Sequence, residues 1–203
     1  MSAPRSSMPL RGAIAALHAA RRSDDVVVTT MGAAREWMAL GTQPLDVVFV
    51  PSSMGQATSL GLGLALARPD RRVVVANGDG SMLMNLGSLV TIAAAAPSNL
   101  VVILLANGVY EVTGAQPIPG AATARSTGTN VDFVAMARAS GFHAVFRFTE
   151  LAEWIAELPA VLAAPGPVFA VVDVAPVPSA PGPRSPGPAA GRARAFMAAL
   201  REG

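Results

Sequence analysis

The chain has 203 residues, enough for one ordinary domain with a sizeable core, and its composition excludes several kinds of site. It has no cysteine, which excludes disulfides and thiolate metal ligands, and all 15 basic residues are arginine, which excludes a Schiff-base lysine and a P-loop lysine. The formal net charge is only +2 and acids and bases are interspersed, so nucleic-acid binding has little support. Hydrophobic residues make up 52% and charged residues 14%, which favours a large interface with another chain.

The chain also lacks a signal for the membrane. Every long apolar run is interrupted by glycine, proline or charge before it reaches membrane-spanning length. The apolar stretch near the N-terminus is too short, and too closely flanked by arginine, for a secretory signal. We therefore expect a cytoplasmic protein that does not bind membranes.

The hydrophobic pattern predicts helices that alternate with short buried strands along most of the chain. The expected helices cover 13–22, 33–40, 56–67, 82–96, 131–140 and 149–163. The expected strands cover 25–30, 46–50, 73–76, 100–106, 143–148 and 168–174. Such alternation is typical of an α/β fold with three layers and a doubly wound, mainly parallel sheet.

Several conspicuous side chains are interpreted as structural. Trp37 lies on the apolar side of its helix, which favours packing in the core or an interface. His18 on a helix and His143 at the start of a strand are expected to have no catalytic role. The pairs Arg21-Arg22 and Arg71-Arg72 are interpreted as solvated ends of helices or loops.

Polar residues follow two strands that one helix connects. Asn77-Gly78-Asp79-Gly80 ends the first strand, Ser81 stands where a helix N-cap would stand, and Asn107-Gly108 ends the second strand. Parallel strands bring these ends to one edge of the sheet, where ligands bind. An acid and an amide oxygen suit Mg²⁺, and a glycine turn before a helix suits a phosphate. The alternative, an ordinary turn capped by Asp79, leaves Asn107 unexplained.

Gly78-Asp79-Gly80-Ser81, followed at a distance by Asn107, resembles the signature of thiamine diphosphate enzymes. The resemblance implies that Mg²⁺ is held by the side chains of Asp79 and Asn107 and by the carbonyl of Val109. Tyr110 matches an aromatic position of that family. The family usually has Asn-Asn, whereas here the first of the two is Ala106.

A second resemblance lies upstream, at Ser52-Ser53-Met54-Gly55. It implies that the Met54 side chain holds the cofactor in a V shape and that the Ser52 carbonyl accepts a hydrogen bond from its 4′-amino group, so both are catalytic candidates. The alternative for Met54 is simple core filling, which its place between a strand and a helix disfavours. The full set of candidate cofactor-binding residues is Ser52, Ser53, Met54, Gly78, Asp79, Gly80, Ser81, Asn107, Val109, Tyr110 and Glu111.

The segments 82–100 and 110–117 resemble sulfopyruvate and phosphonopyruvate decarboxylases, with Ala115 replacing a usual glycine. The resemblance implies a PP-type domain that binds the diphosphate of thiamine diphosphate and Mg²⁺ in a decarboxylase of small 2-oxo acids. Two alternatives stay open. One is a carboligase of the acetolactate synthase type, and the other is a non-catalytic regulatory partner that binds thiamine diphosphate.

The resemblance also implies a partner. The family needs a glutamate on a pyrimidine-binding domain to activate the cofactor, and none of the six glutamates has that context: Glu36, Glu150, Glu153 and Glu157 suit solvated helix faces, Glu202 is near the C-terminus, and Glu111 follows the Asn107 motif. We therefore expect an α-type pyrimidine-domain subunit and an α2β2 or higher oligomer.

The remaining segments are a loop and an arm. Residues 118–130 have loop composition and are expected to cover the active-site end as a lid, with Arg125 as a candidate for the acidic tail of a substrate or simply an exposed arginine. Residues 1–175 are expected to form the domain. Residues 176–203 form a Pro/Gly-rich arm that ends in a short helix over 193–201.

Overall fold

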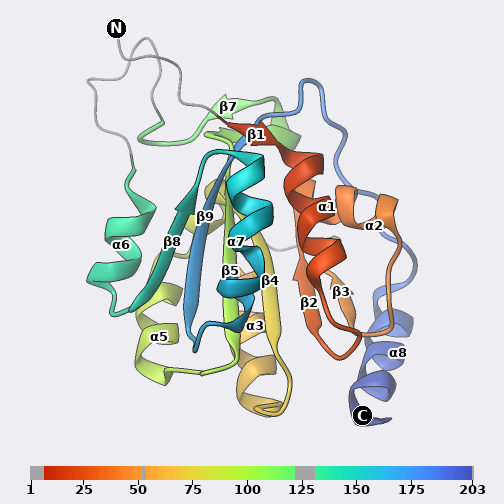
Figure 1. Cartoon of the computed structure of the whole chain (residues 1–203). Coiled ribbons are helices and arrows are strands. Elements are labelled where there is room, and N and C mark those ends of the chain that lie inside the picture. The colour runs from red at the N-terminus through yellow and green to blue at the C-terminus, as the bar shows by residue number, and fades with distance from the viewer. Residues whose placement is uncertain (1–6, 52–53, 122–130, 203) are drawn as a thin grey trace, which may run out of the picture.

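The computed structural model describes residues 7–51, 54–121 and 131–202. Within them, a seven-stranded parallel sheet forms the centre of the molecule, in the order β1-β9-β5-β4-β2-β3, with β8 also paired to β9 (Figure 1). The strands are β1 (Met8–Pro9), β2 (Val26–Thr29), β3 (Asp46–Val48), β4 (Val73–Gly78), β5 (Leu100–Ala106), β8 (Ala144–Phe148) and β9 (Val168–Ala175). A small antiparallel pair, β6 (Val109–Tyr110) and β7 (Gln116–Pro117), flanks the 3-10 turn η1 (Glu111–Thr113).

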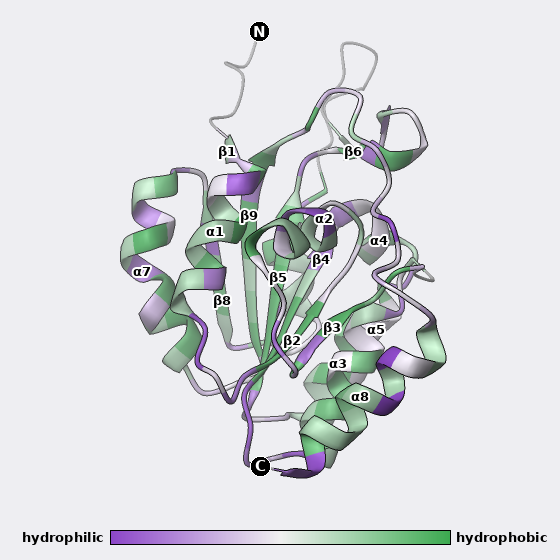
Figure 2. Cartoon of the chain, turned by 90° about the vertical axis from the view of Figure 1, so that its right-hand side faces the viewer, coloured by the Kyte–Doolittle hydropathy of each residue, from purple (hydrophilic) through white to green (hydrophobic). Residues whose placement is uncertain are grey.

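Helices cover both faces of the sheet, and the edge-on view shows the three layers (Figure 2). One face carries α1 (Leu10–Ala20), α2 (Met31–Leu40) and α7 (Leu151–Ala163). The other carries α3 (Ala57–Ala67), α4 (Asp79–Leu83), α5 (Gly87–Ala95), α6 (Phe133–Ala139) and α8 (Ala189–Glu202). The central strands are buried on both faces because they are runs of valine, leucine and isoleucine. The predicted three-layer α/β fold is confirmed.

The strand order places a topological switch point between β2 and β4. From β2 the chain adds β3 on one side and then crosses back to add β4 and β5 on the other. The helices that follow β2 and β4 therefore lie on opposite faces of the sheet. Open parallel sheets bind ligands in the crevice that this divergence creates at the carboxyl ends of the strands.

The helix predicted over 82–96 is instead two helices. α4 begins at Asp79 with Gly78 as its N-cap, so the predicted capping role of Ser81 is wrong. The break before α5 follows from Asn85, whose side chain donates to the Gly55 carbonyl instead of facing solvent. α7 likewise begins after Glu150 and not Thr149, and α8 is longer than the predicted 193–201.

The prediction that the two arginine pairs are solvated is wrong for three of the four side chains. The Arg21 side chain is buried and pairs with Asp46 at 2.5 Å, and Asp46 also accepts from the indole N–H of buried Trp37. Arg72 pairs with Asp25, which is fully buried. Both pairs lie at the amino ends of strands: Arg21–Asp46 joins the end of α1 to β3, and Arg72–Asp25 joins the starts of β4 and β2. A buried carboxylate requires such a cation or donors. Only Arg22 of these side chains is more than half exposed.

The remaining structural interpretations hold where the structure tests them. Trp37 is in the core, and His18 packs edge-on against it while contacting the Gly41 carbonyl at 2.8 Å. His143 is exposed just before β8, away from the carboxyl ends of the strands. Among the described helices, none is both long enough and apolar enough to cross a bilayer.

Candidate functional site

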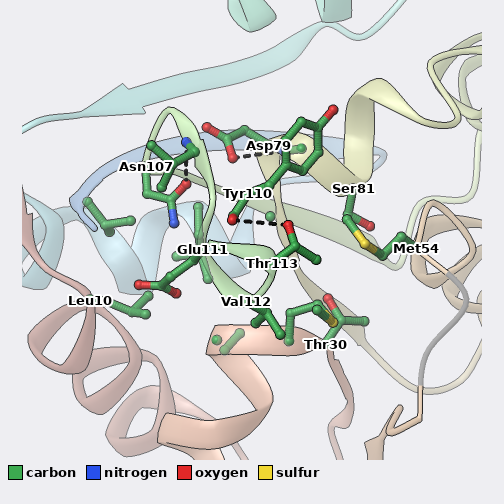
Figure 3. Close-up of a pocket in the computed structure, with 18 residues that line it drawn as sticks. Leu10, Thr30, Met54, Asp79, Ser81, Asn107, Tyr110, Glu111, Val112 and Thr113 are labelled. Carbon is green, nitrogen blue, oxygen red and sulfur yellow. Dashed lines mark hydrogen bonds between the residues drawn. The ribbon is translucent and has the colours of Figure 1, made fainter. Parts of the chain in front are cut away.

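A pocket lies at the switch point, over the carboxyl ends of β2, β4 and β5 (Figure 3). The turn from β2 into α2 forms one wall, the turn from β4 into α4 a second, and the segment after β5 a third. Its lining includes nine of the eleven predicted cofactor residues, namely Met54, Gly78, Asp79, Gly80, Ser81, Asn107, Val109, Tyr110 and Glu111. Ser52 and Ser53, the other two, lie outside the described residues.

Asp79 is the most buried acid of the pocket, with 2% of its surface exposed. Its Oδ1 accepts a hydrogen bond from the N–H of the next residue, Gly80, at 2.8 Å. Its Oδ2 accepts one from the N–H of Gly108 at 2.7 Å. Burial raises the pKa of Asp79 to about 6, although both hydrogen bonds act in the opposite direction. A carboxylate in this position favours a cation that would offset the loss of water.

The bond from Gly108 to Asp79 joins the ends of β4 and β5, as the parallel arrangement predicts. Asn107 is half-buried beside it, and its Oδ1 accepts from the N–H of Val109 at 3.0 Å. The described residues contain no group of three or more His, Cys, Asp or Glu side chains able to hold a metal. A cation here would therefore rely on Asp79, on neutral oxygens such as that of Asn107, and on oxygens of its ligand, which is the habit of Mg²⁺ bound to phosphates.

Tyr110 connects the β5 side of the pocket to the β4 side. A Cβ placed on Gly80 would lie 2.6 Å from Cε1 and 2.7 Å from Cδ1 of the Tyr110 ring. Only glycine allows the ring to lie this close to the backbone. The glycine turn thus serves packing between the two loops in addition to any approach by a ligand.

Met54 lies across the pocket from Asn107, next to Ser81 (Figure 3). Two hydrogen bonds fix the turn that carries Met54. The hydroxyl of Ser81 on α4 accepts from the N–H of Gly55 at 2.8 Å, and the side-chain amide of Asn85, after α4, donates to the Gly55 carbonyl at 2.9 Å. Gly55 has φ of +89°, which favours glycine. Ser81 therefore positions the Met54 turn and does not cap a helix.

Glu111 lines the pocket, but the protein itself uses its carboxylate. Its Oε1 accepts from the N–H of Val177 at 2.5 Å, and its Oε2 lies 3.9 Å from Nη2 of Arg35. The side chain is 7% exposed and points toward Leu10 (Figure 3).

The sequence reasoning missed the β2 wall of the pocket. Thr30 lines it and donates to the amide oxygen of Asn77, which is fully buried, at 3.3 Å. Gly32 follows, and a Cβ there would lie 2.9 Å from Oε2 of Glu111. The predicted strand end at residue 30 was an available signal, but local sequence does not reveal that β2 lies beside β4.

A second cavity, of about 400 Å³, lies on the other side of Asn107. Besides Asp79, which lines both cavities, its charged residues are Arg147 and Asp173. Nε and Nη2 of the arginine lie 2.9 and 3.0 Å from the two carboxylate oxygens of Asp173. Neither residue was singled out from the sequence. Arg125, which was, lies outside the described residues, as does most of the predicted lid.

Residues 16–174 match the family described as thiamine pyrophosphate enzyme, C-terminal TPP binding domain. The chain belongs to this family. The matched residues include both strand ends that form the Asp79–Gly108 contact and the whole segment around Met54.

Sequence similarity to individual proteins supports the same family. The chain is 42% identical over 154 residues to a protein named sulfopyruvate decarboxylase subunit beta from Methanothermobacter thermautotrophicus, covering 75% of each chain. It is 41% identical over 155 residues to a phosphonopyruvate decarboxylase from Streptomyces viridochromogenes, covering 76% of this chain and 36% of that one. The chain thus spans about a third of the latter protein's length.

A solved structure shows the same fold. It is described as a putative thiamin diphosphate-dependent enzyme isolated from Mycobacterium smegmatis, with a TM-score of 0.68 and 23% identity. The similarity covers 85% of this chain and 33% of that one. At this identity the likeness supports the architecture of the thiamine pyrophosphate enzyme domain and not a particular reaction.

Proposed function

We propose that this chain is the diphosphate-binding subunit of a thiamine diphosphate- and Mg²⁺-dependent decarboxylase of small 2-oxo acids. The observation that carries the proposal is the direct contact between Asp79 and the Asn107-Gly108 turn, at the switch point of a domain of this family. The names of the relatives favour a substrate with a sulfonate or phosphonate tail.

The described residues have distinct roles in this proposal. Asp79, Asn107 and the Val109 carbonyl would hold Mg²⁺, which neutralises the diphosphate. Met54 would support the bend of the cofactor from the opposite wall. When bound, the thiazolium supplies the electron sink that makes loss of CO₂ from a 2-oxo acid possible. This chain supplies binding, orientation and a water-poor wall.

A partner subunit fits the position of the glutamates. Glu111 alone lines the described pocket, and Val177 already binds its carboxylate. The other five lie on α2, beside or on α7, and on α8, outside the pocket lining. We infer that an activating glutamate comes from a pyrimidine-domain subunit in an α2β2 or higher oligomer. The "subunit beta" names of relatives support the existence of a partner subunit.

Titration calorimetry with thiamine diphosphate and Mg²⁺ tests the cofactor assignment. We expect Asp79→Ala to abolish binding and Asn107→Ala to weaken it at least about tenfold, because each removes an oxygen ligand. Asp24→Ala is the matched control, since its exposed carboxylate lies at the far end of the sheet and should leave affinity unchanged. Wild-type affinity in Asp79→Ala would overturn the assignment.

Product analysis of the complex with its partner then tests the reaction. Both reactions release CO₂ from a 2-oxo acid. A decarboxylase then releases the remaining carbons as an aldehyde, whereas a carboligase of the acetolactate synthase type joins them to a second carbonyl substrate as a longer hydroxy-keto product. Cofactor binding by the complex without either product would support the regulatory alternative.

A further inference from the structure

The residues after β9 lie outside the family match but contact both sides of the pocket. The family match ends at residue 174, whereas the described chain continues through an extended segment into α8. We call residues 176–202 the C-terminal strap. It passes from the end of β9 along the pocket side of the molecule and returns beside α3 (Figures 1 and 2).

The first part of the strap is bound to the segment after Asn107. The N–H of Val177 donates to Glu111 in η1, and the side chain of Arg35 on α2 donates to the Pro181 carbonyl at 3.2 Å. Gly182 packs so closely on Val112 that a Cβ there would lie 3.0 Å from its Cγ1. Glu111 therefore connects the strap to the loop whose backbone includes Val109.

The second part is bound to the segment that leads to Met54. The guanidinium of Arg192 on α8 donates to the carbonyl of Val48 at 2.5 Å and also to that of Val50. α8 is itself fixed on α3, because Arg68 donates to the carbonyl of Leu200 and the Leu200 side chain is buried. A charged donor on two backbone acceptors is a stronger restraint than a neutral hydrogen bond.

We propose that the C-terminal strap is a positioning element, which fixes the Met54 segment and the segment after Asn107 relative to each other through Arg192 and Glu111. This rests on the proposed function, because these two segments are the walls that would hold the two ends of the cofactor. Glu111 is then a positioning residue and not a cofactor ligand. The strap would contribute to cofactor affinity through preorganisation of the empty site.

Calorimetry on the full chain tests the Arg192 half of the proposal. We expect Arg192→Ala to weaken binding of Mg²⁺ and thiamine diphosphate by about three- to tenfold, since it loses two charged hydrogen bonds. Arg192→Lys retains a donor and should recover part of the loss. Arg194→Ala is the control, because it lies on the same helix, is exposed and has no bond among the described contacts.

The Glu111 half can be followed without cofactor or partner. Tyr110 is the single tyrosine of the chain, so incorporation of 3-fluorotyrosine gives one ¹⁹F resonance that reports on the pocket wall. We expect Glu111→Ala and Val177→Pro to shift or broaden this resonance, since each breaks the bond between strap and loop. Glu111→Gln keeps an acceptor oxygen and should retain the wild-type signal, as should Glu157→Ala on the exposed face of α7.

The outcomes separate this proposal from the proposed function. If the wild-type chain binds the cofactor but Arg192→Ala and Val177→Pro bind it equally well and leave the Tyr110 resonance unchanged, the strap only stabilises the fold and the inference is wrong. If the wild-type chain and its complex do not bind the cofactor, the proposed function fails instead. A changed resonance in that case would still support the mechanical link between strap and loop.

Discussion

In the absence of a cation, the surroundings of Asp79 favour the protonated, neutral carboxyl group more than water does. Two backbone N–H groups partly replace water around its carboxylate, but burial still raises its pKa from 3.8 to about 6. The ionised form therefore destabilises the fold, and a bound cation would reverse that effect. A residue that costs stability in the absence of a ligand is often kept for binding.

The raised pKa of Asp79 predicts how the stability of the fold changes with pH. Because the pKa in the folded state lies above that in the unfolded state, the folded chain holds the extra proton between about pH 4 and pH 6, and stability from Asp79 falls as pH rises through this window. From about pH 5 to about pH 7, we expect wild type to lose about 1 kcal/mol of unfolding free energy relative to Asp79→Asn. Urea unfolding of both proteins in EDTA measures this, and equal slopes against pH would contradict it.

Met54 leads to a prediction on geometry. We expect Met54→Ala to lower kcat of the complex by about tenfold or more while changing cofactor affinity less, because the side chain would hold the reacting groups in position. Steady-state assays at saturating cofactor measure kcat, and calorimetry measures the affinity. Met84→Ala, at an exposed methionine on the turn after α4, is the control. Full kcat in Met54→Ala would assign Met54 to packing alone.

At the scale of the element, the turn from β4 into α4 depends on the absence of a side chain at Gly80. We expect Gly80→Ala to displace the Tyr110 ring, which a new Cβ would meet at 2.6 Å, and to weaken cofactor binding at least about tenfold. Gly87→Ala, at the start of α5 with open space around its Cβ, should be neutral or slightly stabilising. Calorimetry measures cofactor affinity and thermal unfolding measures stability of the two variants. Equal affinity and stability in Gly80→Ala and Gly87→Ala would show that the Tyr110 ring moves without a cost in free energy.

The central strands β2, β4, β5 and β9 were predictable because each is rich in valine, leucine or isoleucine. The strands β1, β6 and β7 were not predicted, because each is only two residues long and has no periodic pattern of its own. The meeting of Asp79 with the Asn107-Gly108 turn followed as well, since one crossover helix fixes two parallel strands side by side. The break between α4 and α5 did not follow, because it depends on a bond from Asn85 to Gly55, far away in sequence. The same holds for Thr30 and for the contact between Val177 and Glu111, which depend on strand order and on the return of the chain.

For the whole molecule, the proposed function makes the pocket one half of a site that a partner subunit completes. We expect the isolated chain to show no decarboxylase activity even with saturating Mg²⁺ and thiamine diphosphate, and activity to appear in proportion to complex formed with the partner. The reason is that the Glu111 carboxylate already accepts a hydrogen bond from Val177, and that no other glutamate lines the described pocket.

Hydrogen–deuterium exchange at C2 of the cofactor, followed by NMR, checks this directly. The isolated chain should leave the exchange rate close to that of free thiamine diphosphate, and the complex should accelerate it. Rapid exchange with this chain alone would show that one of its own glutamates activates the cofactor. Glu111→Gln would then identify whether that glutamate is Glu111.

The hydrogen bonds from Arg192 to the end of β3 also bear on how copies of the protein associate. β3 is the last strand at its side of the sheet, and an uncovered strand there would offer backbone groups to a strand of another molecule. Arg192 occupies the carbonyls of Val48 and Val50, and α8 lies beside them. The two carbonyls are therefore not available to a strand of another molecule, so Arg192 protects this edge against the addition of an intermolecular strand.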